Sequence, residues 1–136
     1  MTQQTRPATY QAGDELPSLA RTITQEKIGR YADAAGDHNP LHTDPEFAAA
    51  TQFGGTVAHG MLVLAYLSEM MTAAFGERWV AGGRMKARFR APARPGDTVT
   101  ATGRVTRVGD GSVRCEAECR NQVGELLISA DVEVPA

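Results

Sequence analysis

The stretch that decides the fold is residues 59–75, which read HGMLVLAYLSEMMTAAF. A helix built from this stretch is apolar on nearly every side, as is typical of a helix that is buried on most sides. Gly76 follows at the position where helices commonly end. The stretch is too short to cross a membrane, and Ser68 and Glu69 make it too polar. The sequence therefore predicts a central helix, covered by the rest of the chain, and no membrane association.

After Trp79 the pattern changes from helical spacing to alternating apolar and polar residues. The alternation predicts strands over 84–91, 98–106, 113–120 and 126–134, joined by tight turns rich in Gly, Pro, Asn and Asp. Such one-faced strands form an antiparallel sheet with a single apolar face, which the central helix covers. With 136 residues, 42% of them apolar, the chain is expected to form one α+β domain over 1–136. Within it, residues 1–13 are expected to form a loose N-terminal arm.

Shorter elements are predicted before the central helix. Residues 16–23 are a weak strand candidate, and residues 25–35 have the spacing of a short helix that Thr24 caps and Gly36 ends. Asp44, Pro45 and Glu46 are typical of a helix start, and that second helix is predicted over 45–51. Residues 37–43, between the two helices, are predicted to be irregular.

Charge and cysteine usage limit the classes of function. The formal net charge of −2 gives no support to a nucleic-acid-binding protein. The first twelve residues contain no apolar run of the kind found in signal peptides, which favours a cytoplasmic location. Cys115 and Cys119 lie on the apolar face of one predicted strand, too far apart along it to form a disulfide. We therefore expect two buried free thiols.

Candidate chemistry lies in the predicted irregular segment, residues 36–42, which read GDHNPLH. Asp37 and His42 flank an Asn-Pro turn, so that a carboxylate and an imidazole are able to point into one space. Such a pair is able to hold and ionise a water molecule by acid–base chemistry. Asn39 is expected to fix the turn by a hydrogen bond to nearby backbone. Each of these residues alone has a plain structural explanation, and only the pair favours a site.

A second candidate feature is the start of the central helix. A helix N-terminus presents free N–H groups and a partial positive charge. The Gly60 N–H is therefore a candidate donor to an oxygen on which negative charge develops, and the lack of a side chain lets a substrate approach. The alternative is that Gly60 serves only helix packing.

The run Tyr31–His42, YADAAGDHNPLH, followed by Ala48, resembles the signature of the MaoC-like (R)-specific enoyl-CoA hydratases. The segment His59-Gly60-Met61 resembles the helix start of that family, and the resemblance extends over nearly the whole chain. It departs from the family at Ala35, where a small polar residue is usual. The resemblance implies a hotdog fold, in which a curved sheet wraps one long helix and a short helical overhang carries the active site.

The resemblance also implies an activity, the reversible hydration of trans-2-enoyl thioesters to (R)-3-hydroxyacyl thioesters. Asp37 and His42 would be catalytic, with Gly60 as the oxyanion donor. No organic cofactor is implied, and no metal is expected because the sequence has no ligand cluster at metal-like spacing. Two alternatives stay open: an acyl-thioesterase, and a non-catalytic module that binds acyl thioesters. The acyl chain length is not fixed by the sequence, since Leu62, Tyr66 and Met70 are among the residues able to shape its site.

Further contacts to substrate are expected from three residues near the motif. Tyr31 is either a wall of the pocket or part of the core. His59 is either a cap or packing residue, or a part of the site. Ser68 falls where the family has a serine that faces the active site, and it bonds either to a catalytic side chain or to its own helix carbonyl.

A basic row is formed by Arg84, Lys86, Arg88 and Arg90, which alternation places on the solvent face of one strand. One interpretation is a solvated face relieved by Glu116 and Glu118 nearby. The other is contact with the phosphates of coenzyme A or of a carrier-protein arm, because arginine binds phosphate bidentately. The expected partners are thus an acyl-CoA or acyl-carrier-protein thioester and a second copy of the chain, in a homodimer or larger assembly that covers the sheet edges.

Overall fold

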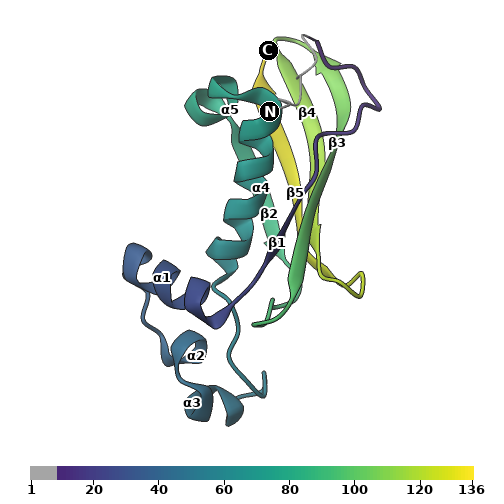
Figure 1. The fold of residues 1–136 in the computed structure, drawn as a ribbon. Coiled ribbons are helices and arrows are strands. Elements are labelled where there is room, and N and C mark those ends of the chain that lie inside the picture. Colours follow the sequence, from purple (N-terminus) through teal and green to yellow (C-terminus); the bar gives the residue numbers. More distant parts are fainter. Residues whose placement is uncertain (1–8) are drawn as a thin grey trace, which may run out of the picture.

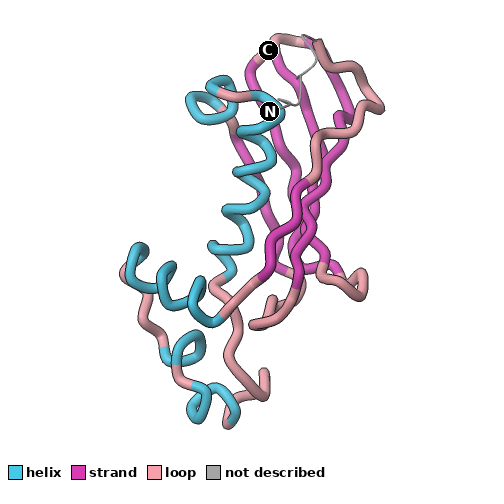
Figure 2. Tube along the Cα trace, in the orientation of Figure 1, coloured by secondary structure: helices cyan, strands magenta, loops and turns pink. Residues whose placement is uncertain are grey.

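The structure is a computed structural model in which residues 9–136 are described. A curved sheet lies along one side of a long helix, and shorter helices gather at the two ends of that helix (Figures 1 and 2). The elements in chain order are β1 (Leu19–Thr22), α1 (Gln25–Ala35), α2 (Pro40–Thr43), α3 (Pro45–Ala49), α4 (Gly60–Phe75), α5 (Glu77–Gly82), β2 (Arg84–Phe89), β3 (Thr98–Gly109), β4 (Ser112–Arg120) and β5 (Leu126–Pro135). This arrangement confirms the predicted α+β class and the long helix wrapped by an antiparallel sheet.

The core lies between α4 and the inner face of the sheet. Leu67, Met70 and Met71 on α4 are fully buried, as are Val99 and Val105 on β3. Burying one side chain of this size contributes roughly 1.5–3 kcal/mol, so this layer supplies much of the stability. Helix α4 is buried on most sides, as predicted, and is open on the face that points away from the sheet. On that face Met61, Ala65, Thr72 and Ala73 are exposed in the single chain.

The order of the strands differs from the one predicted. The five-stranded sheet has the order β1-β3-β4-β5-β2, so β2 does not neighbour β3. It pairs instead with the last strand, where Met85 stands opposite Val132 and Ala87 opposite Ala130. Residues 90–97 are therefore a crossing segment rather than a tight turn. Alternation shows which face of a strand is buried, but it does not show which strand lies beside it.

The inward pattern of β5 also differs at one point. Alternation places Leu126 and Ile128 inward and Leu127 outward, whereas both Leu127 and Ile128 are buried. The reason is a register shift between β4 and β5, at Cys119 and Arg120. The shift leaves Leu127 as an extra residue between the paired Leu126 and Ile128, which allows two successive side chains to face the core.

Helix α1 has its predicted bounds, and its caps explain why. The Thr24 hydroxyl accepts a hydrogen bond from the Lys27 N–H at 3.1 Å, and Gly36 closes the helix with a left-handed φ of 69°. The segment predicted to be irregular contains the short helix α2, which begins at Pro40 because the Asn39 side chain caps it. Helix α3 is shorter than predicted, and helix α5 was not predicted.

The N-terminal segment is not a loose arm where it is described. Tyr10 is 4% exposed, and its hydroxyl donates to the Ala74 carbonyl at 3.1 Å. The Gly13 N–H donates to the Val105 carbonyl at 2.8 Å. Residues 10–13 are thus fixed against the core, while the part of the predicted arm over 1–8 lies outside the described residues. The strand predicted over 16–23 is the shorter β1.

Both cysteines are buried and free, as predicted. Burial raises the pKa of Cys115 to about 11 and that of Cys119 to about 12. Both thiols are therefore protonated at neutral pH and unsuited to nucleophilic chemistry. Over residues 9–136, none of the helices combines the length and apolar character needed to span a bilayer.

Candidate active site

The motif residues lie in the overhang formed by α1, α2 and α3, beside the N-terminal end of α4 (Figure 1). Asn39 organises this segment, because its side-chain oxygen accepts from the Leu41 N–H at 3.0 Å. Its own N–H donates to the Asp37 carboxylate at 3.3 Å. The predicted turn-fixing role of Asn39 is confirmed, and the bond to Asp37 links it to the carboxylate as well.

His42 has a defined hydrogen-bonding state. Its Nδ1 lies 2.8 Å from the Val57 carbonyl oxygen, which only accepts, so Nδ1 carries the proton. This leaves Nε2 with a lone pair, as a general base requires. The side chain of Asp37 is 52% exposed, so water reaches this part of the site.

His59 lies between the predicted pair and α1, and it is only 3% exposed. Its ring stacks on the ring of His42, with centroids 3.8 Å apart and an angle of 25° between the planes. The Tyr31 ring lies on it at 4.9 Å. Its Nε2 is 3.0 Å from the Asp37 carbonyl oxygen and 4.0 Å from the Asp37 carboxylate. The structure thus brings together four predicted site residues.

Three of these four side chains are also close enough to one another to bind one metal ion. Asp37, His42 and His59 each offer a ligand atom, and these atoms lie within 4.8 Å of one another. The sequence spacing gave no sign of this cluster. However, one nitrogen of each imidazole already bonds to a backbone carbonyl, His42 Nδ1 to that of Val57 and His59 Nε2 to that of Asp37. The geometry suits proton transfer better than metal coordination.

The start of α4 presents unused N–H groups next to this cluster. Leu62 and Val63 donate to the His59 carbonyl, whereas the amides of Gly60 and Met61 have no hydrogen-bond acceptor within residues 9–136. Gly60 also has a packing partner, since a Cβ at this position would lie 2.9 Å from the ring of Phe89. Both interpretations of Gly60, oxyanion donor and packing residue, therefore have a structural basis.

Ser68 lies far from the cluster along α4. It follows Gly60 by eight residues, about 12 Å at the rise of an α-helix. Its hydroxyl accepts a hydrogen bond from the indole of Trp79 at 3.0 Å. This partner is neither a catalytic side chain nor a carbonyl of its own helix, the two partners that we expected.

The basic row lies on exposed positions of β2, while Met85 and Ala87 of the same strand pack toward the core. Across the sheet, Arg84 stands opposite Glu133, Lys86 opposite Asp131 and Arg88 opposite Ser129. Of the two carboxylates expected to relieve the row, Glu116 on β4 lines one hollow with Arg84 and Lys86, although its ion pair is with Arg104, whereas Glu118 pairs with Arg120. Arg90 follows the strand and donates to the Ser129 hydroxyl at 3.4 Å.

A groove of about 470 Å³ borders the cluster. It is lined by Arg21, Lys27, Arg30, Tyr31, Leu62 and Tyr66. Leu62 and Tyr66 are two of the residues expected to shape the acyl site, whereas Met70 is fully buried. Burial raises the pKa of the Tyr66 hydroxyl. The three cations of the lining were not predicted as a group, because Arg21 belongs to β1 whereas Lys27 and Arg30 belong to α1.

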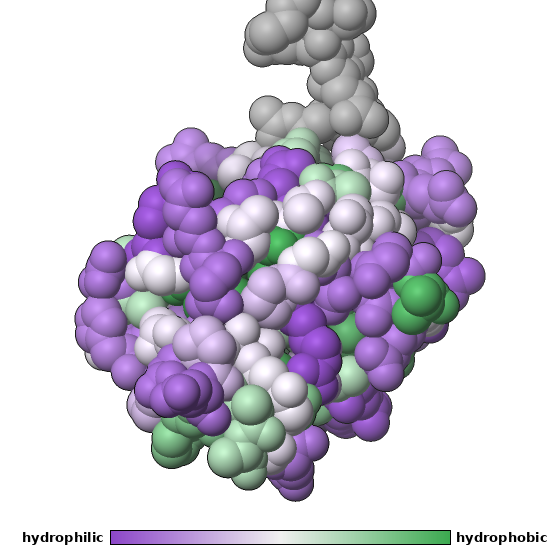
Figure 3. Space-filling view, turned by 60° about the horizontal axis from the view of Figure 1, so that its bottom comes forward, coloured by the Kyte–Doolittle hydropathy of each residue, from purple (hydrophilic) through white to green (hydrophobic). Residues whose placement is uncertain are grey.

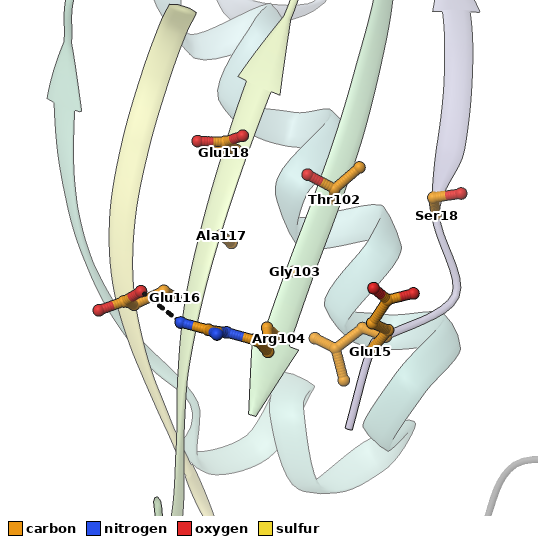
Figure 4. A pocket seen from close by; sticks show the side chains of 9 residues that line it. Glu15, Ser18, Thr102, Gly103, Arg104, Glu116, Ala117 and Glu118 are labelled. Carbon is orange, nitrogen blue, oxygen red and sulfur yellow. Dashed lines mark ion pairs between the residues drawn. The ribbon is translucent and has the colours of Figure 1, made fainter. Parts of the chain in front are cut away.

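Another hollow lies on the opposite face of the sheet from α4 (Figure 4). It has a volume of about 390 Å³, and its polar lining includes Glu15, Glu118 and an ion pair between Arg104 and Glu116 at 3.6 Å. It contains none of the predicted site residues, so the groove beside Tyr31 is the better candidate for substrate.

Comparisons with known proteins agree with the motif and the fold. A family model described as a MaoC-like domain matches residues 9–125. The 3-hydroxyacyl-thioester dehydratase Z of Mycobacterium tuberculosis (strain ATCC 25618 / H37Rv) is 43% identical over 100 residues, covering 68% of this chain and 66% of the relative. The chain thus spans just under two thirds of the length of that relative.

Solved structures are similar over nearly the whole chain. The (R)-hydratase from A. caviae involved in PHA biosynthesis has a TM-score of 0.81 and 25% identity, covering 95% of this chain and 98% of that chain. The ChsH1–ChsH2 complex from Mycobacterium tuberculosis gives a TM-score of 0.81 and 25% identity, covering 93% and 98%. Since the family model covers most of the described chain and agrees with its fold and motif, the chain belongs to the MaoC-like domain family.

Proposed function

We propose that the protein reversibly hydrates trans-2-enoyl thioesters to (R)-3-hydroxyacyl thioesters. The observation that carries the proposal is the His42 imidazole, whose Nδ1 is held by the Val57 carbonyl so that Nε2 is left as a base near the Asp37 carboxylate. The free N–H of Gly60 at the start of α4 supports it. The names of the dehydratase Z and of the A. caviae (R)-hydratase support the same reaction class.

The proposed reaction begins with a water molecule held between Asp37 and His42. His42 Nε2 takes a proton from this water while the oxygen forms a bond to the β-carbon. The electrons of the double bond move toward the thioester oxygen, which becomes enolate-like and accepts a hydrogen bond from Gly60. The Asp37–His42 pair then delivers a proton to the α-carbon and returns to its starting state. Positioned acid–base groups of this kind contribute about 10²–10⁴-fold to a rate.

An acyl-thioesterase would use the same groups differently. Its carboxylate would direct water at the thioester carbon, and a free thiol would be released. Hydration needs both a proton acceptor and a proton donor beside one water. The neighbouring Asp37 and His42 fit this requirement, so we favour the hydratase.

The test follows crotonyl-CoA and trans-2-octenoyl-CoA with the purified protein. We expect the absorbance of the conjugated enoyl group to fall, with no free thiol formed. Release of thiol while 3-hydroxyacyl product is absent would instead establish a thioesterase. Asp37→Asn and His42→Ala should each lower kcat by about 10²–10⁴-fold while the protein stays folded. Asp33→Asn is the matched control, because Asp33 is an exposed carboxylate on α1 whose ion pair is with His38.

For partners we propose a homodimer and a substrate carried by coenzyme A or by a carrier protein. The sheet has two edge strands, β1 and β2, and pairing of two copies would cover one of them. One similar structure is a complex of two different chains, so pairing with a different MaoC-like chain is the competing arrangement.

Of the basic row, Arg88 is the proposed phosphate contact, because its cross-strand neighbour Ser129 carries no charge.

A further inference from the structure

We propose that His59 is a positioning residue, which holds both members of the catalytic pair in place without contacting the substrate. The inference rests on the proposed hydratase function. It goes beyond the expectations for His59, which were a cap or packing residue on one side and a part of the site on the other. The α4 N-cap position is indeed occupied by His59, but its side chain makes no capping hydrogen bond.

The first contact is with Asp37. The His59 Nε2 lies 3.0 Å from the Asp37 carbonyl oxygen, so Nε2 carries a proton and donates it to that oxygen. This bond fixes the backbone from which the Asp37 carboxylate projects. The residues are 22 positions apart in the chain, and the bond joins the overhang to the start of α4.

The second contact is with His42. The two imidazole rings stack at 3.8 Å, and Tyr31 covers His59 at 4.9 Å, so His59 is the middle ring of three. The His42 ring is therefore held on one face by His59 and at Nδ1 by the carbonyl of Val57, two residues earlier in the chain. One short segment, residues 57–60, thus sets the orientation of His42, the backbone of Asp37 and the proposed oxyanion donor.

The unused nitrogen of His59 argues that the hydrogen bond matters. With Nε2 protonated, Nδ1 is an acceptor, and it is buried without a hydrogen-bond partner among the described residues. An unsatisfied buried acceptor destabilises a fold, and a phenyl ring would pack in the same space without that penalty. The other nitrogen, Nε2, explains why an imidazole stands here, because its hydrogen bond holds the Asp37 carbonyl. At 3% exposed, the ring is also too deeply buried to meet a substrate.

Two substitutions separate the two contacts. His59→Phe keeps a ring against His42 and removes the donor to Asp37. His59→Gln keeps an N–H donor and removes the ring. Because misplacement of a catalytic group by about 1 Å costs on the order of 10²-fold, we expect each variant to lower kcat by about 10–100-fold while KM stays near the wild-type value. His38→Phe is the matched control, since this histidine of the same motif is exposed and its ion pair among residues 9–136 is with Asp33.

Two kinetic results would overturn the proposal. A rise in KM with kcat unchanged would make His59 a substrate contact. Unchanged kcat per folded molecule, with only a lower melting temperature, would make it a packing residue.

A measurement without substrate separates this proposal from the proposed function. In the ¹⁵N-labelled wild-type protein, the imidazole NMR signals of His42 should show a single Nδ1–H tautomer. In His59→Gln we expect those signals to average between tautomers, and in His59→Phe we expect them to remain. A His42 spectrum unchanged in His59→Gln would contradict the positioning role. If instead the spectrum changes but wild-type protein hydrates no enoyl thioester, the hydratase proposal fails and the positioning role stands.

Discussion

Gly60 combines a proposed chemical role with a packing contact. Its N–H is the proposed donor to the thioester oxygen, and its Cα lies under the Phe89 ring, where an added Cβ would come within 2.9 Å. In the single chain the ring is 56% exposed, so it is able to move aside at little cost there. Packing within the single chain therefore does not require glycine here, whereas the proposed approach of a substrate to the N–H does.

We predict that Gly60→Ala lowers kcat by on the order of 10²-fold, because the methyl group keeps the thioester oxygen from the N–H, and loss of one such donor costs this much. Turnover of crotonyl-CoA measures the effect. The double variant Gly60→Ala/Phe89→Ala provides the control, because it removes the ring that the methyl group would strike. Recovery of wild-type turnover in the double variant would assign the effect to packing instead.

The candidate site was only partly predictable from its residues. Asp37, His42 and Asn39 stand close together in the chain, so their spacing around an Asn-Pro turn was enough to group them. His59 follows His42 by 17 residues, and its burial and stacking depend on how α4 meets the overhang. The Trp79 indole as partner of Ser68 was not predictable, because it depends on how α5 folds back against α4; a contact between Ser68 and the substrate stays a prediction.

At the scale of elements, a single hydrogen bond joins α4 to α5. The Trp79 indole donates to the Ser68 hydroxyl at 3.0 Å, and Trp79 is 9% exposed. The bond fixes the short helix that leads into β2. Ser68, near the middle of α4, therefore contributes to the fold by fixing α5, which follows the end of α4 away from Asp37 and His42.

We predict that Ser68→Ala and Trp79→Phe each lower the free energy of unfolding by about 1 kcal/mol, the usual net value of one hydrogen bond. Because both remove the same bond, the double variant should lose less than the sum of the two. Urea unfolding measures these values, and kcat should stay unchanged in all three proteins. A clear loss of kcat in Ser68→Ala would instead indicate that Ser68 contacts the substrate or a catalytic side chain.

The predicted helix bounds agree with the structure where capping residues set them. Thr24 and Gly36 bound α1, and Asp44 and Pro45 begin α3, as their residue types predict. The prediction failed for α5, since its six residues are too few to show helical spacing. It failed again for the place of β2, because its pairing with β5 joins residues about 40 to 50 positions apart in the chain, such as Arg84 and Glu133.

At the scale of the whole molecule, the single chain leaves apolar surface near the catalytic end. Met61 is 54% exposed and Phe89 is 56% exposed, both beside Gly60. Figure 3, which turns the lower end of the molecule toward the viewer, shows hydrophobic side chains in separate patches among hydrophilic ones. The exposed face of α4 and the edge strand β2 meet in this region, which favours it as the contact between two copies.

We predict that sedimentation equilibrium gives the mass of two chains. Phe89→Lys should shift the protein toward monomer, since a charge in an apolar contact opposes association. Val80→Lys is the matched control, because Val80 is 71% exposed but lies on α5, at the other end of α4. A wild-type protein that is monomeric at all concentrations would contradict the homodimer and point to a different partner chain.

The crossing of residues 90–97 also has a consequence for the order of folding. Phe89 reaches Gly60 from β2, and within residues 9–136 the sheet partner of β2 is β5, the last strand in chain order. Contacts between such distant parts of a chain form late, because the entropy of closing the loop must be paid first. A ribosome must therefore have released β5 before Phe89 takes its place beside Gly60 at the start of α4. Until then the motif segment, residues 36–42, although synthesised early, lies beside a start of α4 that lacks its Phe89 contact.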